Sequence, residues 1–172
     1  MKTGFIVLIA VALSLTGCGA SASSSESGQA TSKQDKKAAE LEKFASLVES
    51  GSYQFTARTV TPTGGKTIQL TSEYTMEAKE GTYEAHLPYF GRAYSASYGG
   101  DGGIEFTGEP ENLKLARNEK RNTIMASFDI EDDNDQYNIS LEIGSSGYGS
   151  LVINSRKRAS ISYYGQVSEL EP

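Results

Sequence analysis

The side chains that most enzymes use for catalysis are scarce in this sequence. Its 172 residues include one histidine, His86, and one cysteine, Cys18. A Ser-His-Asp site would have to use His86 as its base, and no second histidine or cysteine can complete a zinc site. Because Ala85 and Leu87 alternate with Glu84 and His86, this histidine is expected on the solvent-facing side of a strand. We therefore predict no catalytic residue, no metal ligand and no cofactor.

Carboxylates offer a second route to chemistry, because a pair of them can hydrolyse a glycosidic bond. The candidates are Glu84, Asp101, Glu105 and Glu109, all in one part of the chain. Their spacing singles out no pair, so a glycan or peptide hydrolase stays open as an alternative function.

The densest acidic run is Glu131–Asp135, between two strand patterns. Calcium binds several carboxylate oxygens, but this run lacks the spacing and the glycine of an EF-hand loop. We interpret it as a solvated hairpin turn.

The stretch from Leu87 to Phe106 is the best candidate for a binding site. It joins two strand-like runs, and its glycines permit turns that are closed to other residues. Aromatic rings give contact area, and an arginine fork can hold an anionic or hydroxyl group of a ligand. The candidate ligand-binding residues are Tyr89, Phe90, Arg92, Tyr94 and Tyr98. The alternative is that the rings complete the core and Arg92 pairs with Glu105 or a carbonyl group.

The first 17 residues have the features of a bacterial export signal. Lys2 supplies a positive charge, and Phe5–Leu13 is an apolar run too short to span a membrane. The run is followed by Leu15-Thr16-Gly17-Cys18, which resembles the lipobox of bacterial lipoproteins, where cleavage precedes a lipid-bearing cysteine. We predict a signal peptide at residues 1–17 and a membrane anchor through lipid on Cys18, since two or more acyl chains bind a bilayer stably.

The next two segments are predicted to be a tether and a helix. Residues 18–34 are rich in Ser, Gly and Ala, which is typical of a flexible tether. A helix is expected at Asp35–Ser50, with an apolar stripe of Leu41, Phe44, Ala45 and Val48. This stripe should pack on the sheet that follows, within a single β-rich domain of residues 35–172.

From Ser52 onward the apolar period changes from 3.6 residues to 2, which is typical of strands. The longest alternating run is Ile68–Ala78, after a hairpin turn at Pro62–Gly65. The other strand-like runs are Phe55–Thr61, Tyr83–Leu87, Ile104–Phe106, Leu113–Ala116, Ile124–Ile130, Tyr137–Ile143, Leu151–Ile153 and Ala159–Tyr163. The pattern predicts an all-β, mainly antiparallel domain of about eight to nine strands. One dry face per strand fits either a barrel-like sheet or a sandwich, with the helix packed on it.

Several motifs resemble an uncharacterised family of Bacteroidetes lipoproteins, domain of unknown function 4251. They are Gly64-Gly65-Lys66, Leu87-Pro88-Tyr89-Phe90-Gly91-Arg92-Ala93, the glycine-rich run to Phe106, Asn154-Ser155-Arg156 and Ile161-Ser162-Tyr163-Tyr164-Gly165. The resemblance covers roughly Ser52 to Val167 and implies an exported, lipid-anchored β-rich domain without an assigned activity. Surface-exported lipoproteins of that phylum often carry an acidic run after the cysteine, so its absence here favours the periplasmic face of the outer membrane.

These observations predict a non-enzymatic cell-envelope lipoprotein that binds a small molecule or an envelope protein. The chain carries 16 basic and 22 acidic residues, a net charge of −6, which argues against nucleic acid as a partner. An envelope structural or assembly factor is the third possibility, beside the hydrolase.

Overall fold

The computed structural model describes residues 26–94, 102–132 and 135–170, which form one helix and ten strands. The helix is α1 (Glu26–Glu49). The strands are β1 (Tyr53–Pro62), β2 (Ile68–Gln69), β3 (Thr75–Lys79), β4 (Thr82–Leu87), β5 (Ile104–Gly108), β6 (Glu111–Asn118), β7 (Thr123–Asp132), β8 (Asp135–Gly144), β9 (Tyr148–Ser155) and β10 (Ile161–Glu169). The expected all-β, antiparallel class is confirmed.

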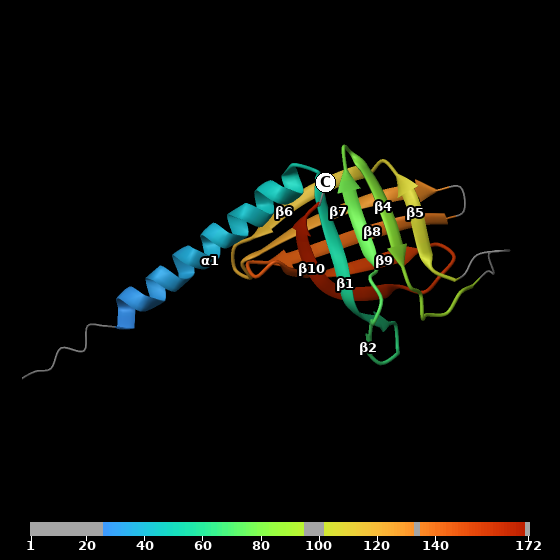
Figure 1. Ribbon diagram of the computed structural model, residues 1–172, viewed down its shortest axis with the longest axis horizontal. Coiled ribbons are helices and arrows are strands. Elements are labelled where there is room, and N and C mark those ends of the chain that lie inside the picture. The colour runs from blue at the N-terminus through green and yellow to red at the C-terminus, as the bar shows by residue number, and fades with distance from the viewer. Residues whose placement is uncertain (1–25, 95–101, 133–134, 171–172) are drawn as a thin grey trace, which may run out of the picture.

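All the strands belong to one curled sheet. Its order is β5-β4-β3-β1-β10-β9-β8-β7-β6, with β2 paired to β1 in addition, and every pairing is antiparallel. Figure 1 shows the half that contains β1, β4 and β5 crossing in front of the half that contains β7, β8 and β9. The sheet therefore curls into a half-barrel, and its buried face lies on the inside.

Aromatic side chains from the two halves of the sheet meet in the interior. The Tyr83 ring of β4 lies 4.3 Å from the Phe128 ring of β7, between ring centroids. Phe106 of β5 and Tyr137 of β8 are 5.1 Å apart in the same way. Because these rings are all buried, the alternation that the sequence shows from Tyr53 onward does mark one shared core.

The predicted long strand at Ile68–Ala78 is interrupted, which corrects the expectation from alternation. Strand β2 pairs with the second half of β1, and strand β3 pairs with the first half of β1. Between these pairings β1 has a bulge at Arg58, and the Arg58 carbonyl accepts a hydrogen bond from Leu70 N at 2.9 Å. A bulge bends a strand, so the partner strand breaks there and Ile68 stays 38% exposed.

The sheet is curled but its two edge strands, β5 and β6, are not paired with each other within the described part of the chain. The chain turns from β5 to β6 close to β7. A Cβ added to Gly108, the last residue of β5, would lie 3.3 Å from the Ile130 side chain of β7. Every residue of β6 is exposed. Its backbone is bulged near Asn112, which has a left-handed φ of 55°.

Helix α1 begins at Glu26, nine residues before the Asp35 expected from the sequence. Residues 26–34 therefore belong to the helix rather than to the predicted tether, because adding a residue to an existing helix costs less than starting one. Figure 1 shows that only the C-terminal part of α1 reaches the sheet, while the rest projects outward.

The predicted stripe does face the sheet, with Leu41 and Val48 buried and Phe44 and Ala45 half-buried. Arg117 of β6 donates a 2.6 Å hydrogen bond to Glu42 of α1, which adds a polar contact at the rim of this packing. Among the described residues no helix is both long and apolar enough to cross a bilayer.

Candidate functional site

The predicted aromatic segment leaves β4 at the end of the sheet that lies away from α1, as Figure 1 shows. Its backbone is held by the turn between β9 and β10. Tyr94 N donates to the Lys157 carbonyl at 2.7 Å, and Ala159 N donates to the Arg92 carbonyl at 2.9 Å. The segment up to Tyr94 is therefore a fixed part of the fold.

Tyr89 is the inward-facing anchor of this segment. Its ring is half-buried against the core, and its hydroxyl lies 2.7 Å from the Arg92 carbonyl and 3.0 Å from the Ala159 carbonyl. The ring covers Gly91, where an added Cβ would lie 2.6 Å from the Tyr89 Cζ. Burial raises the pKa of the Tyr89 phenol, against the lowering effects of the Ala159 carbonyl and Arg158. The hydroxyl therefore stays protonated at neutral pH and can donate to either carbonyl.

Arg158, which no sequence motif marks, contacts the ring of Tyr89. Its guanidinium lies 5.2 Å from the centroid of the Tyr89 ring, which is cation–π distance. The same group donates to the carbonyls of Gly102 and Gly103. Arg158 thus connects the two described ends of the stretch that runs from Tyr94 to Gly102. No signal in the sequence separates Arg158 from the nearby Arg156.

A second tyrosine holds the start of the segment. Tyr163 of β10 is fully buried and donates from its hydroxyl to the Pro88 carbonyl at 2.9 Å. Burial raises the pKa of this phenol far above its usual value, so it also remains a donor at neutral pH.

The other predicted binding residues point outward. Phe90 is 50% exposed, Tyr94 is 72% exposed, and Arg92 is also exposed. Tyr98 lies outside the described residues. The two interpretations left open by the sequence therefore apply to different residues: Tyr89 packs against the core, whereas the side chains of Phe90, Arg92 and Tyr94 are exposed.

We predict that Tyr89→Phe lowers the free energy of unfolding by about 1 kcal/mol, the usual net value of an intramolecular hydrogen bond. The variant keeps the ring and removes only the hydroxyl that lies between Arg92 and Ala159. Urea unfolding measures the change, and Tyr94→Phe is the matched control because that ring is exposed. Equal effects of the two substitutions would contradict an anchoring role for Tyr89.

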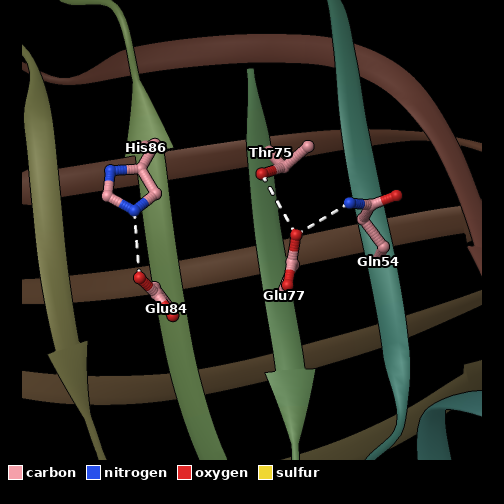
Figure 2. Close-up of polar contacts among 5 residues, drawn as sticks. All are labelled: Gln54, Thr75, Glu77, Glu84 and His86. Carbon is pink, nitrogen blue, oxygen red and sulfur yellow. Dashed lines mark hydrogen bonds and ion pairs between the residues drawn. The ribbon is translucent and has the colours of Figure 1, made fainter. Parts of the chain in front are cut away.

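His86 and Glu84, two of the candidates for catalysis, lie on the outer face of β4. His86 Nε2 lies 3.0 Å from Glu84 Oε1, and both side chains are more than half exposed. Figure 2 shows Glu77 on the neighbouring strand, where its carboxylate accepts from Gln54 at 2.8 Å and is 3.5 Å from Thr75 Oγ1. These groups are spread over an open sheet surface. His86 therefore has the exposed position that the alternation predicted.

The other candidate carboxylates that the structure describes lie in β5 or just after it. Glu105 pairs opposite His86 in the sheet, Glu109 follows β5, and Asp101 lies outside the described residues. In the described ranges no group of three or more His, Cys, Asp or Glu side chains is arranged to hold a metal ion.

The acidic run Glu131–Asp135 does connect two strands, β7 and β8, as predicted. One of its members is not solvated, which corrects the interpretation of the whole run as a wet turn. Asp135 is only 9% exposed, because its carboxylate accepts hydrogen bonds from Ser155 Oγ and from the Gln136 amide. Its role is to fix the start of β8.

The described chain is thus a curled antiparallel sheet with an N-terminal helix and an anchored aromatic segment. The chain belongs to the family described as "Domain of unknown function (DUF4251)", whose sequence profile matches residues 35–167. A solved structure of similar fold is a DUF4251 family protein from Bacteroides eggerthii DSM 20697, with a TM-score of 0.58 and 19% identity over 79% of this chain and 91% of that chain. No curated protein matches the sequence.

Proposed function

We propose that this DUF4251 protein is a lipid-anchored lipoprotein of the cell envelope that binds a ligand or partner without chemical catalysis. The lipobox-like Leu15-Thr16-Gly17-Cys18 supports the anchor. The periplasmic face of the outer membrane is the proposed location. With lipid on Cys18, the helix α1 holds the domain away from the bilayer and leaves the aromatic segment at the opposite end.

The observation that carries the binding role is the exposure of Phe90, Arg92 and Tyr94 on a fixed backbone. Tyr89 and the turn that contains Arg158 hold that backbone, so little backbone freedom is lost when a ligand binds to the exposed side chains. Tyrosine and arginine are also the side chains that most often dominate binding energy at interfaces. Phe90, Arg92 and Tyr94 are the residues of this proposed binding surface, which we call the aromatic end surface.

The anchor is tested by metabolic labelling with an alkyne analogue of palmitate. The wild-type chain should incorporate the label and fractionate with membranes, whereas Cys18→Ser should lose both properties, because Cys18 is the one cysteine of the sequence. Labelling of the Cys18→Ser chain would contradict the lipid anchor.

The binding role is tested in intact cells with a photoreactive phenylalanine in place of Tyr94. This position is 72% exposed, so the probe should form a discrete crosslinked adduct without disturbing the fold. Adding Phe90→Ala and Arg92→Ala to the same chain should reduce the adduct at least fivefold.

The matched control places the same photoreactive residue at Lys66, which is exposed in the turn between β1 and β2. An adduct at Tyr94 and none at Lys66 supports binding at the aromatic end surface. Equal crosslinking at the two positions, or an adduct that persists in the double variant, would count against it.

A further inference from the structure

The outer face of β7, β8, β9 and β10 is a second polar surface, separate from the aromatic end surface. Side chains that alternate with the buried ones form it, and the register places them in rows across the four strands. The face is roughly 14 Å across and 20 Å long, from the spacing of strands and residues in a sheet. Its middle row is made of the short side chains Ser127, Ser140, Val152 and Ser162.

One end of this face carries two stacked tyrosines. Tyr148 of β9 and Tyr164 of β10 have ring centroids 5.8 Å apart and planes inclined by 16°. Their side chains are 40% and 51% exposed. The negative face of an aromatic ring attracts groups with partial positive charge, and the C–H groups of a sugar ring are of this kind.

The other end carries a row of carboxamides and one carboxylate. Asn154 Nδ2 donates to Asn138 Oδ1 at 3.4 Å, and Asn138 Nδ2 donates to Asp129 Oδ1 at 2.8 Å. These residues line a pocket of 270 Å³ together with Gln136, Ser155 and Arg156. Each carboxamide has two donor hydrogens and an acceptor oxygen. The row therefore keeps donors for the hydroxyl groups of a ligand after its internal bonds are made.

We propose that this face binds an uncharged oligosaccharide. Sugar rings would stack on Tyr148 and Tyr164, and hydroxyl groups would bond to Asn138 and Asn154. The short side chains of the middle row leave room for a chain of sugars to lie flat between the two ends.

The charges on the face favour an uncharged glycan over an acidic one. Asp129, Glu131 and Glu142 are carboxylates of this face, and hydrogen bonds from Asn138 and Asn112 hold the pKa of Asp129 below its usual value. An anionic sugar would therefore meet negative charge across this face. Arg156 lines the pocket, and Lys114 and Arg121 lie near Asp129 and Glu142 and offset part of that charge. An extended peptide is a weaker fit, because peptides add to the edge of a sheet rather than to its face.

The test is calorimetric titration of the full-length protein with chitotetraose, cellotetraose and mannotetraose, and with trigalacturonic acid as the anionic comparison. We expect at least one neutral tetrasaccharide to bind and the uronic acid not to bind. Tyr164→Ala should weaken this binding at least tenfold, and Asn154→Ala should weaken it several-fold.

Tyr164→Phe keeps the ring and should retain the affinity, while thermal unfolding confirms that each variant is folded. Tyr94→Ala should leave the affinity unchanged, which separates this face from the aromatic end surface. The proposal is overturned if none of the three neutral tetrasaccharides binds, if Tyr164→Ala and Asn154→Ala bind like the wild type, or if Tyr94→Ala abolishes binding.

Discussion

Replacing Gly165 by alanine should destabilise the protein by about 3 kcal/mol, at the upper end of the cost of overpacking a core. Gly165 lies in β10 opposite Ala57, next to the bulge of β1. A Cβ at this position would lie 2.9 Å from both the Ala57 Cα and the Phe55 Cζ, and closer still to the Thr56 carbonyl oxygen. Backbone atoms cannot move aside as the tip of a flexible side chain can, so β1 and β10 would have to separate.

The control is Gly144→Ala at the end of β8, where the nearest atom to an added Cβ is the Tyr148 carbonyl oxygen at 3.7 Å. That distance is ordinary contact, so urea unfolding should show a change within about 0.5 kcal/mol. If Gly165→Ala unfolds at the same urea concentration as Gly144→Ala, the close approach of β1 and β10 is wrong.

Replacing Phe128 by alanine should lower the free energy of unfolding by about 4 kcal/mol, as for large-to-small changes of aromatic residues in other cores. Phe128 is 1% exposed and contacts Tyr83 across the folded sheet. Removing the ring would leave a cavity between the two halves, which meet through such side chains.

The same substitution at Phe90 is the control, because Phe90 is half exposed and its loss should cost within about 0.5 kcal/mol. The two variants thus compare one residue type at the core and at the aromatic end surface. A large loss of stability in Phe90→Ala would show that this ring is structural, and it would remove the main support for the proposed binding role.

Most strands could be predicted from the sequence because one of their faces is buried and the other is at least partly exposed to solvent. Alternation alone identified the buried faces of β4, β7 and β8, and the Pro62–Gly65 and Glu80-Gly81 turns stand where the pattern places them. The break between β2 and β3 could not be predicted in this way, because it is caused by a bulge in another strand. The early start of α1 was missed because residues 26–34 have no apolar stripe to mark them.

The candidate site was predictable in composition but not in orientation. Tyr89 and Phe90 are adjacent and both aromatic, yet one is held against the core and the other faces water. That difference depends on the Arg92 and Ala159 carbonyls, which are separated by 67 residues in sequence and are brought together only by the folded sheet. Arg158 could not be recognised for the same reason.

The shape of β6 has a consequence for crowding at a membrane. Lipidation would confine many copies to a two-dimensional layer, where open sheet edges of neighbouring molecules meet often. The left-handed backbone at Asn112 and the exposed charge of Lys114 interrupt that edge, and natural sheets use such features to prevent strand-to-strand aggregation. If Cys18 carries the proposed lipid, these features would disfavour strand pairing between the β6 edges of neighbouring copies.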